Sequence, residues 1–150
     1  MKKILLAVDG SEKSMKAAEK ARDLALSTGA NLTLITVVAD NFYYGSPDFS
    51  QNMSPGQMQE LIEESKKQAE KKGEKILEEV ETYMKEKDIE VKKIIHYGDS
   101  AENICRVAEE DEFDLIVLAD KGEGGVKRFL LGSTSDRVVR HADTSVLIVK

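Results

Sequence analysis

A glycine-rich stretch near the C-terminus, residues 119–135, holds the residue types best suited to binding a small ligand. Three glycines let its backbone turn tightly and come close to a ligand: Gly122, Gly124 and Gly125. A predicted helix then opens, and its free N–H groups, dipole and hydroxyls favour an anion such as a phosphate; its first residues are Gly132, Ser133, Thr134 and Ser135. Three basic side chains add positive charge: Lys121, Lys127 and Arg128. The stretch therefore predicts a phosphate-binding loop.

An ordinary structural role would explain the same residues. A flexible loop followed by a Ser/Thr helix cap has this composition, and glycines next to a cap carry little specificity alone. The stretch is neither a Walker loop nor a Rossmann fingerprint, because it lacks a Gly-Lys-Ser/Thr sequence and its glycines follow the fourth predicted strand instead of the first. On these residues alone, phosphate binding and simple capping are both open.

Five short apolar runs rich in β-branched residues predict the strands that position this loop: 4–8, 32–38, 89–95, 115–118 and 146–149. Helical patterns lie between them, at 11–29, 57–87, 99–108 and 133–141. Ser11 and Gly29 are the expected caps of the first helix, and Asp99 or Ser100 is the expected cap of the third. The alternation predicts an α/β fold with a doubly wound, five-stranded parallel sheet in the order 3-2-1-4-5, within a single domain over residues 1–150.

Ligands of such sheets bind at the carboxyl ends of the strands, near the point where the strand order reverses. The sequence offers three candidate loops there, namely 9–11, 98–100 and 119–135. A further segment, 40–56, follows the second predicted strand, shows no periodicity and contains both prolines and half of the aromatic residues. Loops this long are usually functional or disordered, so we expect a flexible loop that serves as a flap.

Composition and charge exclude several classes of protein. The 150 residues are 41% hydrophobic and 33% charged, as in globular proteins, and the net charge of −6 disfavours general binding to nucleic acid or anionic membranes. Residues 115–150 hold six basic and four acidic side chains, so a local charge of +2 coincides with the glycine-rich stretch. The single cysteine, Cys105, excludes an internal disulfide and a multi-thiolate metal site. The first apolar run is too short for a signal peptide, so we expect a cytoplasmic protein.

Four motifs, in this order and spacing, resemble the universal stress protein family. They are Val8-Asp9-Gly10-Ser11, the segment from Gly98 to Ile104, the segment from Asp114 to Val117, and Gly122 followed after nine residues by Gly132-Ser133. The resemblance covers the whole chain. It implies a homodimeric stress-response or signalling protein that binds ATP or a related adenine nucleotide as a sensor, with Mg or Mn held mainly by the phosphates and at most slow hydrolysis.

The resemblance also implies a role for each site residue. Asp9 would meet the adenine or its sugar, Ala7 would line the pocket, and the backbone of Val37 would face the adenine edge. The ribose and phosphates would be wrapped by Ala119, Asp120, Lys121, Gly122, Gly124 and Gly125. The terminal phosphates would be held by the backbone of Gly132, Ser133, Thr134 and Ser135.

Two residues of the loop depart from the family's pattern. Ala119 replaces the first signature glycine, so that a positive φ or the closest approach of a ribose would be costly there. Asp120 replaces a small neutral residue and puts a carboxylate beside the expected phosphates, which Lys121, Lys127 or a divalent cation would have to offset. Both departures support an alternative function, a dimeric interaction module of the same family that does not bind nucleotide.

The last predicted strand is expected at a sheet edge, where the resemblance implies pairing across a two-fold axis in a homodimer through Val146, Leu147, Ile148 and Val149. Cys105 is expected to be a buried, inert thiol, His141 to be structural, and His96 to lie near the site without marking a metal. No paired carboxylates or Ser/His/Asp set has the spacing of a catalytic motif. A receiver domain and an adenylating enzyme are disfavoured, because the end of the first strand has neither an acidic pair nor a Ser-Gly-Gly loop.

Overall fold

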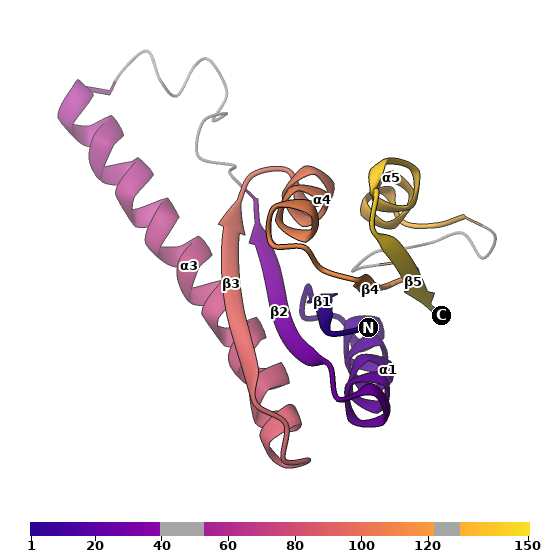
Figure 1. The fold of residues 1–150 in the computed structure, drawn as a ribbon. Helices are drawn as coiled ribbons and strands as arrows, with labels where there is room; N and C mark the ends of the chain where they lie inside the picture. Colours follow the sequence, from indigo (N-terminus) through magenta and orange to yellow (C-terminus); the bar gives the residue numbers. More distant parts are fainter. Residues whose placement is uncertain (40–52, 122–129) are drawn as a thin grey trace.

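The computed structural model describes residues 1–39, 53–121 and 130–150, which form five strands and four helices. In chain order these are β1 (Lys3–Ala7), α1 (Glu12–Thr28), β2 (Asn31–Val38), α3 (Pro55–Lys85), β3 (Val91–Tyr97), α4 (Ser100–Glu110), β4 (Leu115–Ala119), α5 (Ser133–His141) and β5 (Ser145–Val149). The strands pair in parallel in the order β3-β2-β1-β4-β5 (Figure 1). The predicted fold class and strand order are therefore confirmed.

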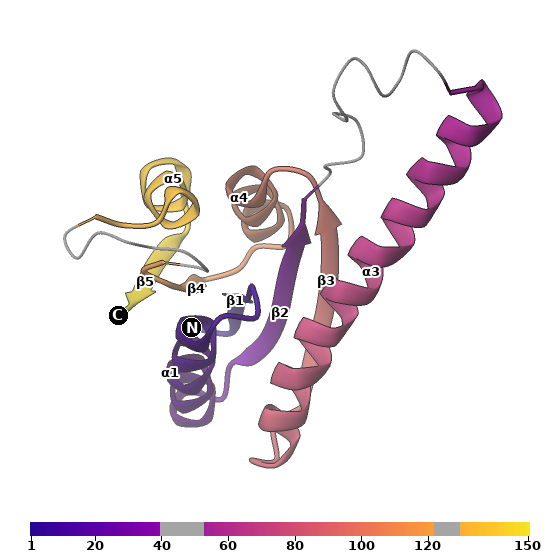
Figure 2. The same ribbon diagram turned by 180° about the vertical axis from the view of Figure 1, so that it is seen from behind.

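The helices cover both faces of the sheet, as a doubly wound sheet requires (Figures 1 and 2). On one face, alanines of α1 and the second half of α3 pack on β1 and β2; this cluster includes Ala17, Ala21, Leu77, Val80 and Met84. On the other face, α4 and α5 pack on the sheet through a second cluster, which includes Ala101, Ile104, Val107, Phe113 and Val138. Burial on two faces explains why the central strands read as unbroken apolar runs.

The predicted caps of the first helix are confirmed. The Ser11 side chain accepts a hydrogen bond from the Ser14 amide, and Gly29 ends α1 with a left-handed φ of 71°. For α4 the sequence left two candidate caps, and the structure selects Asp99, whose side chain accepts from the Glu102 amide. These local hydrogen bonds fix where the helices begin and end.

Two predicted boundaries are wrong. The third strand runs from Val91 to Tyr97 and not from 89 to 95, because the amide of Ile89 donates to the Met84 carbonyl in the turn that ends α3. The long helix begins at Pro55, preceded by a capping box between Ser54 and Gln57, so the last two residues of the predicted 40–56 loop are helical. Residues 40–52 of that loop lie outside the described part of the chain.

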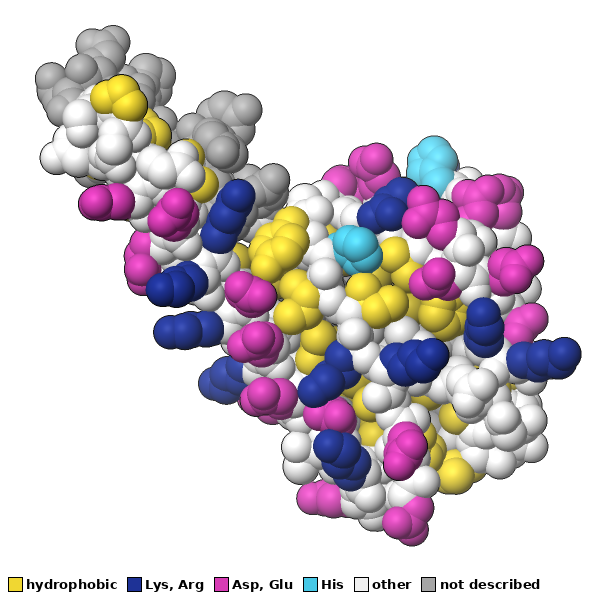
Figure 3. Space-filling view, turned by 60° about the vertical axis from the view of Figure 1, so that its left-hand side comes forward, with side chains coloured by type: hydrophobic (Ala, Val, Ile, Leu, Met, Phe, Trp, Pro, Cys, Tyr) yellow, Lys and Arg dark blue, Asp and Glu magenta, His cyan; other side chains and the backbone are white. Residues whose placement is uncertain are grey.

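The helix α3 is anchored along only half of its length. Its buried residues all lie in the second half, namely Gly73, Ile76, Leu77, Val80 and Met84. The first half projects past the carboxyl ends of β2 and β3 and carries side chains of both charges (Figures 1 and 3). At Gly73 the helix comes so close to the sheet that an added Cβ would lie 3.1 Å from Cγ1 of Val38. No helix among the described residues is long and apolar enough to cross a membrane.

Candidate functional site

A cavity of about 760 Å³ opens at the carboxyl ends of the strands. Its walls come from β1, β2 and β4 and from the helices α1, α3, α4 and α5. Nine of the residues predicted from the sequence line it: Ala7, Asp9, Val37, Ala119, Lys121, Gly132, Ser133, Thr134 and Ser135. Asp120 stands next to two of them without lining the cavity itself, and Gly122, Gly124 and Gly125 fall outside the described residues. The fold thus joins three separate segments of sequence around one cavity.

The N-terminus of α5 is the part of the cavity best suited to an anion. Gly132 is its N-cap, with φ −63° and ψ 157°, and no side chain in the described part of the chain caps the helix. By contrast, Ser11 and Asp99 cap α1 and α4 with their side chains. The first amides of α5 are therefore left for a ligand, and the helix dipole adds a partial positive charge.

Backbone and hydroxyl hydrogen bonds fix the start of α5 against the end of β4. The amide of Gly132 donates to the Asp120 carbonyl at 2.7 Å. The buried hydroxyl of Ser135 donates to the Ala119 carbonyl at 2.8 Å. Ser135 is thus engaged through its side chain, which ties the start of α5 to the end of β4.

Ala119 occupies the position of the first signature glycine without the expected strain. It is the last residue of β4, paired with Val149, and so has an extended backbone. A positive φ is not needed there. Of the two penalties expected from this alanine, only the steric one, against a ribose, can apply.

Asp120 is neutralised by a residue that the sequence did not suggest. Its Oδ1 lies 2.7 Å from Nζ of Lys13, in the first turn of α1. The hydrogen bond and the charge of Lys13 hold the pKa of Asp120 below its usual value, with a smaller contribution from Lys121. The negative charge of Asp120 is therefore offset before any ligand binds. Lys13 provides most of this offset, and Lys121, which the sequence suggested for the role, contributes less. Lys127 lies outside the described residues.

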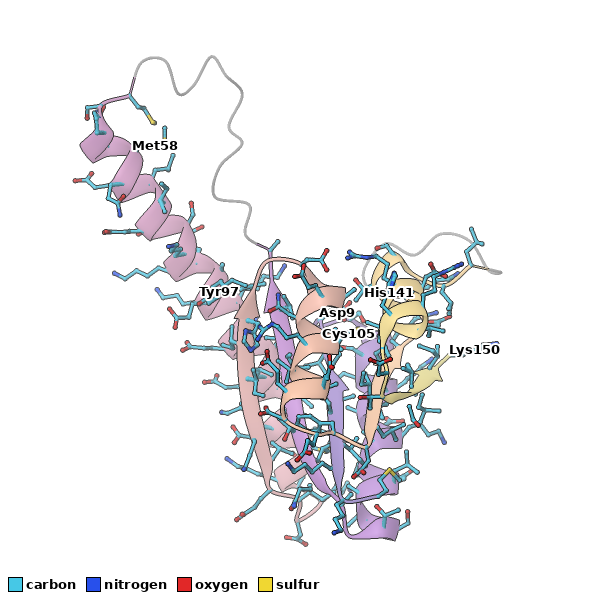
Figure 4. All side chains as sticks on the ribbon, turned by 45° about the horizontal axis from the view of Figure 1, so that its top comes forward. Asp9, Met58, Tyr97, Cys105, His141 and Lys150 are labelled. Atoms are coloured by element: carbon cyan, nitrogen blue, oxygen red, sulfur yellow. The ribbon has the colours of Figure 1, made fainter. Side chains whose placement is uncertain are left out.

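Asp9 and Val37 present polar groups beside each other. The Oδ1 atom of Asp9 accepts from the Ser11 amide at 3.0 Å, which leaves the second carboxylate oxygen for a ligand. Figure 4 shows Asp9 at the end of the sheet where the cavity opens. Pairing of β1 with β2 ends at Ala7 and Ile35, and the Ile35 carbonyl accepts from the Val8 amide. Because backbone groups of alternate residues point to the same side, those of Val37 point toward β1 just past the end of the ladder.

The wall supplied by α3 was missed at the sequence level. Ala69, Lys72 and Ile76 line the cavity from this helix at intervals of three and four residues. The sequence contains that spacing, but residues three and four apart on one helix face are equally typical of a helix that packs on the core. Ser14, Thr36 and Ser100 are further polar residues of the lining that were not predicted as site residues.

The remaining candidate residues have other surroundings. Burial raises the pKa of the half-buried Cys105 thiol, which opposes its reaction as a thiolate. His141 ends α5 and His96 lies in β3, and neither lines the cavity. Across the described ranges, no group of three or more His, Cys, Asp or Glu side chains is placed to hold a metal ion.

Comparison with known proteins gives a consistent result along the whole chain. The model of the Universal stress protein family matches residues 1–150. Universal stress protein MJ0531 of Methanocaldococcus jannaschii is 34% identical over 149 residues, which are 99% of this chain and 82% of the relative. Universal stress protein YxiE of Bacillus subtilis is 32% identical over 148 residues, 99% of this chain and 98% of the relative.

Solved structures show the same fold. Universal stress protein UspA from Lactobacillus plantarum superposes with a TM-score of 0.78 at 27% identity, covering 99% of this chain and 97% of that one. More distant structures include a universal stress protein in complex with cAMP, with TM-score 0.65, 23% identity and coverage of 99% and 96%. Another is a family protein from Arabidopsis thaliana with AMP bound, with TM-score 0.67, 20% identity and coverage of 100% and 92%. The chain belongs to the universal stress protein family.

Proposed function

We propose that this protein binds ATP or a related adenine nucleotide and acts in the cytoplasm as a homodimeric stress-signalling module. The observation that carries the proposal is the uncapped N-terminus of α5, which shares one cavity with Asp9, Val37 and Lys121. Two relatives of the same fold are described with AMP or cAMP bound, which supports an adenine nucleotide as the ligand.

Each part of the proposed nucleotide has a matching part of the cavity. The adenine edge would hydrogen-bond to the backbone of Val37, against the apolar side chains of Ala7 and Ile35. The free oxygen of Asp9 would accept from the base or the sugar. The terminal phosphates would receive the first amides of α5, with Lys121 adding charge. The residues fit a divalent cation held mainly by the phosphates, which would reduce the charge repulsion of the bound polyphosphate.

The proposed homodimer would form through β5. This strand is at the edge of the sheet, and its four apolar residues, Val146 to Val149, are all only half-buried. The opposite edge strand, β3, carries Lys92 and Lys93, which discourage pairing between edges. Of the two edges, β5 is therefore the one suited to an isologous partner.

The first test is binding of ATP with MgCl2, measured by titration calorimetry, together with the mass of any small molecule released on denaturation. An adenine nucleotide at near one per chain would support the proposal. If the protein shows no heat with near-millimolar ATP, the proposal fails and a nucleotide-free interaction module becomes the better description.

The substitution Gly132→Val tests the position of the phosphates. The φ and ψ of Gly132 suit valine, so the variant is expected to fold and dimerise, while the added side chain blocks the amides of α5. We expect ATP binding to be lost. Gly56→Val, in the first turn of α3, is a control for the loss of a glycine. Unchanged affinity in Gly132→Val would place the phosphates elsewhere.

A further inference from the structure

The cavity has a second cationic group, Lys72, in a part of the fold that the family's motifs do not include. It comes from α3, and its neighbours Ala69 and Ile76 on the same helix face also line the cavity. We propose that Lys72 is a ligand-binding residue that makes the site select for the number of negative charges on its ligand, and therefore for nucleoside polyphosphates over monophosphates and cyclic monophosphates. This inference rests on the nucleotide site proposed above.

The packing of α3 fixes where Lys72 can reach. The adjacent residue, Gly73, is the point of closest approach to the sheet, where an added Cβ would lie 3.1 Å from Val38 Cγ1 and 3.4 Å from Thr36 Cγ2. One turn further along α3, Ile76 packs against the turn at Gly10, where an added Cβ would lie 3.1 Å from Ile76 Cγ1. The backbone at Lys72 is thus held over the ends of β1 and β2, beside the predicted adenine and sugar positions.

The balance of charge in the lining favours an anion. Among the described residues, its ionisable side chains are Asp9, Lys72 and Lys121, which sum to +1 with all three charged. Lys121 is only 7% exposed, and the described residues provide its ammonium with no ion-pair or hydrogen-bond partner. The uncapped end of α5 adds a partial positive charge. Asp120 does not alter this balance, because Lys13 offsets it.

The two lysines act from different sides of the cavity. Lys121 follows β4, whereas Lys72 is held over β2, and β1 lies between these strands. Two strand spacings amount to about 10 Å, so both cations lie within about one Debye length of a ligand at the centre. The amides and dipole at the N-terminus of α5 can balance a single negative charge on the ligand without Lys72. Each further charge gains attraction from Lys72, so the contribution of this lysine grows with the charge of the ligand.

The test compares Lys72→Gln with Lys71→Gln, which removes the same charge from the adjacent exposed position of α3 that does not line the cavity. Affinities for ATP, AMP, cAMP and inorganic tripolyphosphate are measured by calorimetry at low and high salt. For Lys72→Gln we expect ATP and tripolyphosphate to bind about fivefold more weakly at low salt, AMP, which carries about two charges, about twofold more weakly, and cAMP, which carries one charge, to change least. High salt should reduce the difference, and Lys71→Gln should match the unmodified protein.

The outcomes separate this inference from the proposed function. Equal losses in the two variants, no loss in Lys72→Gln, or an equal loss for all four ligands would overturn the role of Lys72. If the unmodified protein binds tripolyphosphate but no adenine nucleotide, the proposed function fails while tripolyphosphate still tests Lys72. If it binds neither, both proposals fail.

Discussion

Asp99 shows how one side chain can serve two helices at once. It caps α4 through the Glu102 amide at 2.8 Å and also forms an ion pair with Arg137 of α5. The Arg137 guanidinium, followed by the Glu102 amide, holds the pKa of Asp99 below its ordinary value. Since Ser100 and the first residues of α5 both line the cavity, this pair links two of its walls.

The pH dependence of stability should reveal this pair. Because the pKa of Asp99 is lower in the folded protein than the value near 3.9 of an unfolded chain, its contribution is fully present above that value. The contribution is lost as the pH falls through the folded-state pKa. Asp99→Asn should therefore lower the free energy of unfolding in urea at pH 7 and have a much smaller effect at pH 3. Arg137→Gln is the matched control from the other side of the pair, and equal effects of Asp99→Asn at both pH values would contradict the prediction.

At the residue scale, local interactions were predictable and distant ones were not. Ser11 and Gly29 act on backbone groups within a few residues, so composition and order were enough to predict them. The partner of Asp120 is 107 residues away, and it is set by β1 and β4 lying side by side in the sheet. The predicted strand order already contained that adjacency, but not the direction in which the Lys13 side chain points.

Among the elements, α3 comes close to the sheet at one of its glycines. Its second half is buried, and Gly73 is where the helix meets Val38, Thr36 and Ile95 of the sheet. A larger side chain there would push the helix away from the sheet or displace Val38, which also lines the cavity.

We expect Gly73→Val to lower the free energy of unfolding by about 1–3 kcal/mol, the usual cost of overpacking. Gly56→Val provides the control, because a Cβ at Gly56 meets nothing within 4 Å and lies in the same helix. Its effect should stay within about 0.5 kcal/mol. Urea unfolding measures the free energy of unfolding of both variants. Equal values for the two would mean that the close contact at Gly73 does not restrict the size of the side chain there.

The boundaries of α3 and β3 illustrate the limits of periodicity. The pattern of apolar residues located both elements, yet missed the start of each by two residues. The helix α3 begins at Pro55 although no apolar stripe marks its first turn, because a capping box and a proline in the first turn favour a helix start there. Ile89 is apolar and was predicted to begin the third strand, but it belongs to the turn that follows α3, where its amide donates to the Met84 carbonyl.

The edges of the sheet determine how the whole molecule could assemble. In β5, the carbonyl of Val149 faces β4, where it accepts from the Asp120 amide at 2.8 Å. Because backbone groups alternate along a strand, the amides of Leu147 and Val149 face β4 and those of Val146 and Ile148 face outward. A homodimer formed by edge pairing would use the outward groups.

Two neighbouring proline substitutions should therefore have different effects, one mainly on the dimer and the other on the stability of the fold. Ile148→Pro removes an outward amide, so it should give a folded monomer by light scattering, with a lower melting temperature from the lost isoleucine contacts. Leu147→Pro removes an amide that faces β4, leaving a carbonyl of the ladder unpaired at a cost of about 1–3 kcal/mol or more. Circular dichroism should show Leu147→Pro to be the less stable of the two. A dimer that persists in Ile148→Pro would exclude edge pairing through β5.

The sequence by itself determined the order and kind of elements, the family, and nine of the residues around the cavity, because strand periodicity, helix caps and motif spacing are local properties. Only the tertiary structure decided that Lys13 offsets Asp120, that Ala119 needs no positive φ, and that α3 brings Lys72 to the cavity. The extended backbone of Ala119 follows from its pairing with Val149, whereas the roles of Lys13 and Lys72 depend on how side chains from segments far apart in sequence are directed once the helices pack on the sheet. That direction is set by contacts such as the one at Gly73, which no periodicity encodes.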